Sequence, residues 1–182
     1  AINKQMKITP LSFKDVLLIE PEVFKDERGF FFESFNQRTF NKLIGREVKF
    51  VQDNQSRSKK NVIRGLHFQI EKPQIKLIKV ISGSIFDVVV DIRKQSKNFG
   101  KHISVELNAE DNKQLWIPEG FAHGFLVLSE IAEVQYKVSE FWDPKLERSL
   151  LWSDEDLNIN WPLSSNPIMS SKDQKASLIK DF

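Results

Sequence analysis

Cysteine is absent from the 182 residues of this sequence. Its absence excludes disulfide bonds, thiolate ligands for a metal ion and a cysteine nucleophile. A chain without cysteine fits the reducing cytoplasm, where disulfides are rare, and we expect that localisation.

A strong net charge and long apolar runs are also lacking. Lysine and arginine number 27 against 25 acidic residues, so the formal net charge is only +2, too small to favour nucleic acid. No stretch approaches the roughly 20 apolar residues that span a bilayer, and the start of the chain lacks the apolar run of a signal peptide. We expect no nucleic-acid partner and no membrane partner. Residues 1–5, before Met6, are interpreted as a tag or a short extension.

Aromatic residues, by contrast, are abundant, with 15 Phe and four Trp beside seven Gly and seven Pro. This composition favours a strand-rich core with tight turns. The length predicts one domain, 1–182. Short strand-like runs predict an all-β antiparallel sandwich or barrel, for which a jelly roll is the most economical arrangement. The predicted strands are 75–81, 85–93, 102–107, 113–117, 125–129 and 132–142. Only 36–45, ending at Gly45, and the tail 170–182 look helical.

The run "IFDVVVDIR" at 85–93 alternates between two faces. One face, interpreted as core, carries Phe86, Val88, Val90 and Ile92. The other, expected to be partly wet, carries Asp87, Val89 and Asp91. We expect Asp91 and Arg93 to form an ion pair at the strand end without a catalytic part. In the basic stretch "SRSKKNVIR", Lys59 and Lys60 are interpreted as part of a solvated loop.

Two of the three histidines lie in unusual settings. In "WIPEGFAHGFLVL" the pattern P-x-G-x-x-H, ending at His123, resembles the second signature of the cupin jelly rolls. "RGLHFQ" at 64–69 lies where cupins carry their first signature, but it offers His67 alone instead of two histidines and a glutamate. A transition metal needs about three or four protein ligands. We therefore predict no metal site, and His102 is interpreted as a structural residue at a strand edge.

Five longer segments narrow the resemblance. They are "DERGFFFESFN" (26–36), "FVQDNQSRSKKNVIRGLHFQ" (50–69), "GSIFDVVVDIRKQSKNFGK" (83–101), "QLWIPEGFAHGFLVLSE" (114–130) and "YKVSEFWDP" (136–144). Together, in this order, they resemble the dTDP-4-dehydrorhamnose 3,5-epimerases. The resemblance implies a cupin-type jelly roll that epimerises dTDP-4-dehydro-6-deoxy-D-glucose at C3 and C5 without a metal or redox cofactor. It also implies a homodimer that exchanges its N-terminal segment.

The chemistry of such a reaction explains which groups are needed. Inversion beside a ketone requires a base, a group that stabilises the enolate oxygen, and an acid on the opposite face. We assign the base to His67, because histidine titrates near neutrality. The resemblance implies Asp173 as its carboxylate partner, Lys76 as the enolate stabiliser on an adjacent part of the same sheet, and Tyr136 as the acid. Asp87 is expected to be the buried counter-charge of Lys76, and a nearby cation is expected to lower the pKa of Tyr136.

The nucleotide part of the substrate requires fixed cations and a stacking surface. The resemblance implies that Arg64 contacts the diphosphate, that His123 contacts the sugar and that Trp142 stacks on thymine. Its further implied substrate contacts are Arg28, Glu33, Gln52, Asn54, Glu147 and Lys172. Of these, Arg28 and Glu33 are expected to reach the neighbouring subunit.

Alternatives remain open for several of these assignments. The chain can be an epimerase that acts at C3 alone, a catalytically silent sugar-nucleotide-binding cupin, or a metal-dependent cupin, which the missing ligands disfavour. Asp173 can instead belong to a helix N-terminus beside Ser170 and Ser171, and the two roles are compatible.

Overall fold

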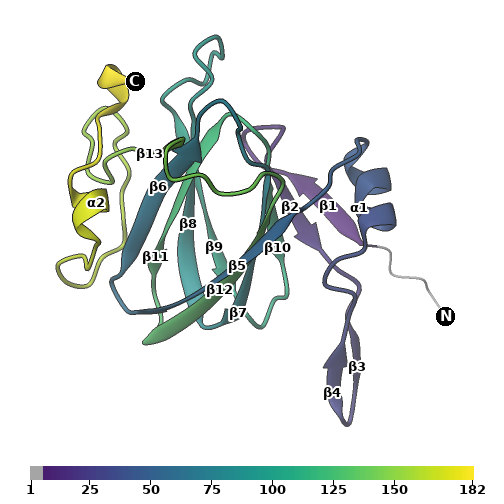
Figure 1. Ribbon diagram of the computed structural model, residues 1–182. Helices are drawn as coiled ribbons and strands as arrows, with labels where there is room; N and C mark the ends of the chain where they lie inside the picture. Colours follow the sequence, from purple (N-terminus) through teal and green to yellow (C-terminus); the bar gives the residue numbers. More distant parts are fainter. Residues whose placement is uncertain (1–5) are drawn as a thin grey trace.

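The computed structural model describes residues 6–182 and consists mainly of antiparallel strands in two facing sheets (Figure 1). One sheet, in the order β1-β2-β10-β7-β12-β5, contains β1 (Lys7–Pro10), β2 (Leu17–Glu20), β10 (Gln114–Ile117), β7 (Lys76–Ser82), β12 (Ile131–Val138) and β5 (Gln52–Lys59). The second, in the order β13-β6-β11-β8-β9, contains β13 (Glu147–Ser149), β6 (Ile63–Gln69), β11 (Phe121–Val127), β8 (Ser84–Asp91) and β9 (His102–Asn108). The prediction of an antiparallel all-β jelly roll is confirmed.

Apolar side chains fill the space between the two sheets. The six-stranded sheet contributes Ile78, Val80, Leu115 and Val134 to this interior, and the five-stranded sheet contributes Ile85, Val89, Leu107 and Phe125. Each of these side chains is buried, so the interior forms one packed core, and Phe125 belongs both to this core and to the lining of the polar cavity described below.

The outer faces of both sheets are covered as well. Residues 150–182 pack against the outer face of the five-stranded sheet, where Leu157 and Trp161 meet Val88 and Leu126. This segment includes the short helix α2 (Ser171–Gln174) and the 3-10 turn η1 (Ile179–Asp181), and it lies beside β6 and β11 in Figure 1. On the six-stranded sheet a cluster around Phe40 of helix α1 (Gln37–Ile44) covers the other outer face.

This double coverage corrects the interpretation of the run at 85–93. The alternation of side chains is as expected, but the face that carries Asp87 and Val89 points into the barrel interior instead of toward water. Asp87 and Asp91 are fully buried, and the opposite face, with Val88 and Val90, packs under the C-terminal segment. A strand buried on both faces gives little sequence signal about which face is wet. The predicted ion pair does form, because Arg93 Nη2 lies 2.9 Å from Asp91 Oδ2.

Polar or short strands were missed by the sequence analysis. Strand β5 reads "QDNQSRSK" and was interpreted in part as a loop, although it pairs with β12 over its whole length from Gln52 to Lys59. The short strands β1, β2 and β13 gave no clear periodic signal. Helix α1 is confirmed, with Asn36 as its N-cap and Gly45 in the left-handed conformation at its end. The predicted helical tail is reduced to α2 and η1.

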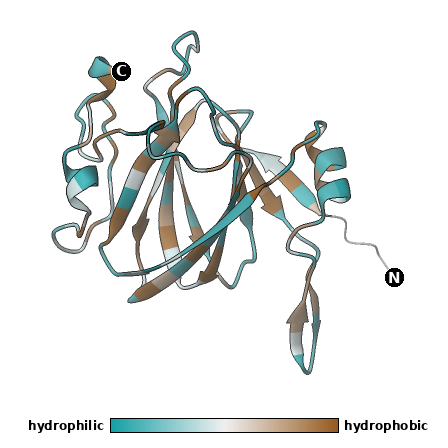
Figure 2. Cartoon of the chain, in the orientation of Figure 1, coloured by the Kyte–Doolittle hydropathy of each residue, from teal (hydrophilic) through white to brown (hydrophobic). Residues whose placement is uncertain are grey.

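A two-stranded hairpin, β3 (Phe24–Asp26) and β4 (Gly29–Phe31), projects away from the barrel (Figure 1). Its apolar side chains are not packed against the rest of the chain, because Phe24, Phe30 and Phe31 are 56%, 61% and 69% exposed. Figure 2 shows the resulting hydrophobic stretch on β4, while the turn at the end of the hairpin is hydrophilic. Such an exposed aromatic group is typical of a surface that another protein covers.

Within residues 6–182, no helix combines the length and the apolar character needed to cross a membrane. The interpretation of residues 1–5 as a tag or extension falls outside the part of the chain that the structure describes.

Candidate active site

A polar cavity of about 390 Å³ opens between the two sheets. Most of the predicted site residues line it. The five-stranded sheet contributes Arg64, His67, His123 and Glu147, and the six-stranded sheet with its neighbouring loop contributes Gln52, Asn54, Lys76, Tyr136 and Trp142. The cavity therefore has two chemically different walls that face each other across the barrel.

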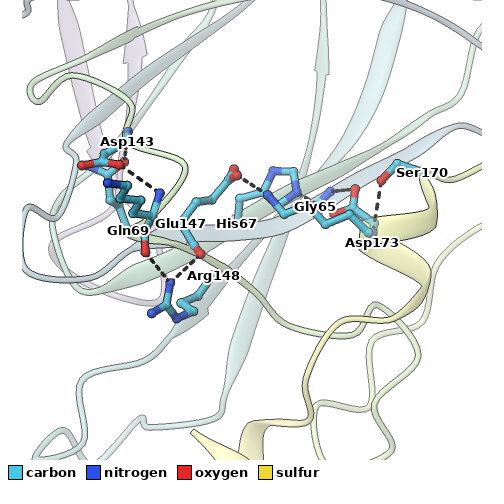
Figure 3. Close-up of polar contacts among 10 residues, drawn as sticks. Gly65, His67, Gln69, Asp143, Glu147, Arg148, Ser170 and Asp173 are labelled. Carbon is cyan, nitrogen blue, oxygen red and sulfur yellow. Dashed lines mark hydrogen bonds and ion pairs between the residues drawn. The ribbon is translucent and has the colours of Figure 1, made fainter.

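His67 and Asp173 are in contact although they are far apart in the sequence. His67 Nε2 lies 2.7 Å from Asp173 Oδ1, and the second carboxylate oxygen accepts a hydrogen bond of 3.1 Å from the Gly65 backbone N–H (Figure 3). Burial acts to raise the pKa of Asp173, but the hydrogen bond and positive charge of His67, aided by Gly65 and Ser170, hold it below its usual value. The ionised carboxylate fixes the histidine tautomer with the proton on Nε2, which leaves Nδ1 as the basic nitrogen.

Asp173 reaches β6 because the C-terminal segment turns at that point. Ser170 is the N-cap of α2, and its hydroxyl accepts a hydrogen bond of 3.1 Å from the Asp173 backbone N–H. Asp173 thus lies in the first turn of the helix and also contacts His67, so the two alternatives from the sequence coexist.

Two glycines allow this part of the sheet to close. Gly65 adopts φ +103°, and a Cβ at this position would lie 2.6 Å from the His123 carbonyl oxygen. A Cβ on Gly124 would lie 2.6 Å from the Arg64 carbonyl oxygen. These contacts are too short for any side chain, so β6 and β11 can approach each other beside both histidines only where glycine is present.

Lys76 is the buried cation of the cavity. It lies at the start of β7, in the six-stranded sheet, whereas His67 lies in the five-stranded sheet. The expectation that both residues share one sheet is wrong. Burial lowers the pKa of Lys76 to about 8, while the nearby charges of Glu147 and Asp87 act in the opposite direction. The lysine is still mainly protonated at neutral pH, but it gives up its proton far more easily than an exposed lysine.

Asp87 is a buried counter-charge of Lys76, as expected, but the two side chains form no ion pair. Asp87 Oδ2 instead lies 2.7 Å from Nε2 of His123, the residue that faces His67 across the β6–β11 pairing. The other oxygen, Oδ1, is buried without a hydrogen-bond partner in the described chain. Burial raises the pKa of Asp87, although His123 and, more weakly, Lys76 oppose this shift. Asp87 acts on Lys76 only through the field of its charge.

Tyr136 lies on β12, in the sheet opposite His67. The prediction that a cation lowers its pKa is wrong in its net effect, because burial raises the pKa of the phenol. A hydrogen bond with Asn54 and the charge of Arg64 reduce this shift, whereas Glu147 adds to it. The phenol therefore keeps its proton at neutral pH.

Two of the expected substrate contacts, Arg64 and Glu147, are each held by a side-chain partner. Arg64 Nε donates a hydrogen bond of 2.9 Å to Ser58 Oγ, which holds the guanidinium in place. Glu147 forms an ion pair with Lys172 and also interacts with Trp142, and these contacts hold its pKa below the usual value against the effect of burial. Trp142 itself is 52% exposed, so its indole face is free for stacking in the described chain.

Arg28 and Glu33 do not reach this cavity. Arg28, on the projecting hairpin, forms an ion pair with Asp26. Glu33 accepts a hydrogen bond of 2.8 Å from Asn36 Nδ2. The chain therefore does not bring these two predicted contacts to its own site.

Sequence analysis missed residues that hold the site in place. Gln69 is buried and anchors the loop that carries Trp142, because its Nε2 donates to the Phe141 carbonyl at 3.1 Å. Its Oε1 accepts from the Asp143 N–H at 3.0 Å (Figure 3). Ser58 was likewise missed. A glutamine at the end of an apolar strand is the one signal that could have suggested such an anchor, since buried polar groups require partners.

Metal ligands were not expected, and among residues 6–182 no group of three histidine or acidic side chains is placed to hold a metal ion. His102 lies on β9, an edge strand, as predicted.

Comparisons with known proteins bear on what this cavity does. The family model described as dTDP-4-dehydrorhamnose 3,5-epimerase matches residues 10–181. The chain is 57% identical over 175 residues to the dTDP-4-dehydrorhamnose 3,5-epimerase of Salmonella typhimurium, with 96% of each chain covered. Its fold matches a solved dTDP-6-deoxy-D-glucose-3,5-epimerase of Legionella pneumophila in complex with dTDP-4-keto-L-rhamnose, with TM-score 0.94, 45% identity and coverage of 96% and 93%. It also resembles a 3′-monoepimerase of Streptomyces bikiniensis in complex with dTDP-quinovose, with TM-score 0.88, 32% identity and coverage of 94% and 87%.

Proposed function

Because the chain belongs to the dTDP-4-dehydrorhamnose 3,5-epimerase family, we propose that it inverts C3 and C5 of dTDP-4-dehydro-6-deoxy-D-glucose to give dTDP-4-dehydro-L-rhamnose, in the biosynthesis of dTDP-L-rhamnose. One observation carries the mechanism. A histidine paired with a carboxylate lies on one wall of the cavity, and the single tyrosine of the chain lies on the opposite wall. Inversion needs such a two-sided arrangement, because the proton leaves one face of a carbon and returns to the other.

The first step is removal of the proton beside the C4 ketone. Nδ1 of His67 takes this proton, and the electron pair of the C–H bond moves to the C4 oxygen, which becomes an enolate. Asp173 stabilises the imidazolium that forms, since its carboxylate already accepts the Nε2 hydrogen bond.

The enolate requires a positive group near its oxygen. Lys76 supplies an ammonium in a buried setting, where a charge interacts more strongly than in water. With a pKa of about 8, this ammonium matches a growing negative charge better than an exposed lysine would, because it shares its proton more readily. His123, held by Asp87, lines the same cavity and is proposed to contact the sugar.

The second proton transfer comes from Tyr136. Its phenol gives its proton to the carbon from the face opposite His67, the enolate collapses to the ketone, and the phenolate then regains a proton from solvent. His67 releases the proton it took. Each cycle exchanges protons only, so the reaction requires no oxidant, reductant or metal. Repetition at the second carbon completes the double inversion.

The nucleotide is proposed to be held at the mouth of the cavity. Arg64 contacts the diphosphate, because a guanidinium fixed by Ser58 can present paired donors to phosphate oxygens. Trp142 stacks on the thymine ring, and Gln52, Asn54, Glu147 and Lys172 supply polar contacts.

The remaining contacts, Arg28 and Glu33, are proposed to enter the cavity of a second copy of this chain in a homodimer. Support comes from the projecting hairpin, whose apolar side chains Phe30 and Phe31 are left exposed. Complementation tests this exchange. Arg28→Ala and His67→Ala are each expected to be inactive, but mixed subunits recover about a quarter of the wild-type sites, because random pairing makes half of the dimers mixed and each has one complete site. Failure to recover activity in dimers shown to have mixed would contradict the exchange.

A second candidate function is epimerisation at C3 alone, which is favoured by the resemblance to the 3′-monoepimerase. Both reactions use the same base, acid and cation. The chain's greater identity to the 3,5-epimerases makes double inversion the first proposal.

Proton NMR in deuterated water with dTDP-4-dehydro-6-deoxy-D-glucose separates these functions. Deuterium at C3 and C5 with an inverted product supports the proposal, whereas inversion at C3 alone supports the monoepimerase. Binding without exchange would indicate a silent binding protein. His67→Ala should abolish exchange, and His102→Ala is the matched control, because that histidine lies on an edge strand outside the cavity.

A further inference from the structure

Two side-chain amides on the six-stranded wall form a hydrogen-bonded chain that runs toward the proposed acid. The Trp142 backbone N–H donates to Gln52 Oε1 at 3.1 Å, and Gln52 Nε2 donates to Asn54 Oδ1 at 2.9 Å. Asn54 lies directly opposite Tyr136 in the pairing of β5 with β12, and both side chains line the cavity. The role of this chain rests on the proposed function, in which Tyr136 is the proton donor.

The direction of the chain is fixed at its first bond. A backbone N–H can only donate, so the atom of Gln52 that faces Trp142 must be its carbonyl oxygen. The amide nitrogen of Gln52 then faces Asn54, which must present its own carbonyl oxygen. The Asn54 carbonyl oxygen is engaged by Gln52, and its NH₂ group, which can only donate, remains for a further acceptor such as the phenol oxygen.

The effect of Asn54 on the phenol agrees with this direction. The hydrogen bond with Asn54 lowers the pKa of Tyr136, while burial raises it. A hydrogen bond favours ionisation of an acid when it is donated to the oxygen that becomes negative. A bond donated by the Asn54 NH₂ group to the phenol oxygen agrees with this effect, and it leaves the phenol's own hydrogen free to point elsewhere.

We infer that Gln52 and Asn54 form a one-way hydrogen-bond relay, from the Trp142 backbone to the Tyr136 oxygen, that directs the tyrosine's proton toward the substrate. Both are positioning residues for the acid, in addition to any contact they make with the sugar nucleotide. Bonds that run in one direction polarise one another, so the relay also stabilises the phenolate that remains after proton transfer.

The relay connects two parts of the reaction that are separate in the sequence. It begins on the loop that carries the proposed thymine-stacking residue, and this loop is also held by Gln69. A ligand that orders the loop around Trp142 thereby orders the backbone N–H that donates the first bond. The relay thus gives recognition of the base a physical route to the acid.

Two variants reverse the relay at different points. Asn54→Asp replaces the donor that faces Tyr136 with an acceptor, so the phenol's hydrogen turns toward the carboxylate and away from the substrate. Gln52→Glu keeps the acceptor for Trp142 but offers Asn54 no donor. The Asn54 amide must then turn its NH₂ toward Glu and its carbonyl toward Tyr136, which produces the same reversal without any change in residues that contact the phenol.

The measurement is the ratio of two outcomes in deuterated water. With His67 intact, deuterium can return to the same face, which gives exchange without inversion. Inversion needs Tyr136. Both variants are expected to raise the ratio of exchange to inversion roughly tenfold, because one hydrogen bond to the transferring group is lost and a wrong one is gained. Asp53→Asn is the matched control, since Asp53 lies on the same strand and pairs with Lys137 on the outer face.

The outcomes separate this inference from the proposed function. A wild-type protein that neither exchanges nor inverts would overturn the proposed function itself. Active wild type with variants that raise only KM, at an unchanged ratio, would overturn the relay and leave Gln52 and Asn54 as substrate contacts. If both variants melt at the wild-type temperature, loss of fold is excluded. Gln52→Glu is the decisive variant, because it leaves every residue next to the phenol unchanged.

Discussion

Two histidines on the same sheet of this epimerase each pair with a carboxylate at the same distance, yet the environments of the two pairs differ. The nitrogen–oxygen distance is 2.7 Å in both His67–Asp173 and His123–Asp87. The pKa of Asp173 is held below its usual value, whereas that of Asp87 is raised. The His67 side chain is 31% exposed and that of His123 only 7%.

The difference comes from the other contacts of each carboxylate. Asp173 receives a backbone N–H from Gly65 and belongs to a helix N-terminus capped by Ser170, so its charge is well compensated. One oxygen of Asp87 has no hydrogen-bond partner in the described chain. Equal geometry of a pair therefore does not mean equal chemistry. The first pair suits a base that must become positive, and the second suits a ring that is held in place beside a buried cation.

The largest expected effect comes from removing the charge of the first pair. Asp173→Asn should lower kcat roughly 1000-fold, because the amide cannot stabilise the imidazolium and disturbs the tautomer of His67. Steady-state kinetics measure the effect. A loss no greater than that of Asp87→Asn would contradict the functional difference between the pairs.

Loss of the cation beside the second pair should have the next largest effect. Lys76→Met is expected to lower kcat roughly 100-fold, because the enolate loses its positive partner. In the wild type, the lysine is charged below its pKa of about 8 and neutral above it, so kcat should fall as the pH rises through about 8. Lys76→Arg retains the charge and should remove this alkaline decrease. If the decrease persists in that variant, another group is responsible for it.

A smaller effect is expected from the second carboxylate. Asp87→Asn should lower kcat about tenfold through looser positioning of His123. The charge of Asp87 raises the pKa of Lys76, so its removal should move the alkaline decrease to a lower pH than in the wild type. A full pH profile of the variant measures this shift, and an unchanged profile would show that Asp87 does not act on the lysine.

The smallest effect concerns stability, where the two carboxylates should have opposite signs. The lowered pKa of Asp173 means that its charge stabilises the fold above the ordinary value of 3.8 and that this contribution is lost as the pH falls below it. The raised pKa of Asp87 means that its ionisation destabilises the fold, and the wild type regains stability as the pH falls toward 3.8. Urea unfolding of each Asn variant against the wild type, from pH 6 to pH 3.5, should give differences that change in opposite directions.

Much of the fold could be predicted from the sequence because its apolar strands are bounded by turn residues. The exceptions have a common cause, which is that the two faces of the strand do not differ in polarity. Strand β5 is polar on both faces, since one side lines the cavity and the other meets solvent, so it lacks the alternation that identifies strands. In β8 both faces are buried, and the pattern could not tell the barrel interior from the face under the C-terminal segment.

For the site, too, the sequence could not predict which residues contact one another. The residue types at the cavity followed from the resemblance and from the chemistry of inversion, but their partners did not. That Asp87 contacts His123 instead of Lys76 depends on the pairing of β8 with β11, and that Lys76 faces His67 from the other sheet depends on strand order. Gln69 and Ser58 act through backbone or side-chain partners that only the folded chain brings near.

The C-terminal segment described above has a consequence for the synthesis of the protein. Residues 150–182 carry Asp173 and also cover one outer face of the barrel, and they follow every strand of both sheets in the chain. A nascent chain that still lacks them can form the strand that bears His67 but cannot orient that histidine or hide the apolar face behind it. On the proposed mechanism, activity therefore waits until residues 150–182 have packed onto the barrel and Asp173 has reached His67.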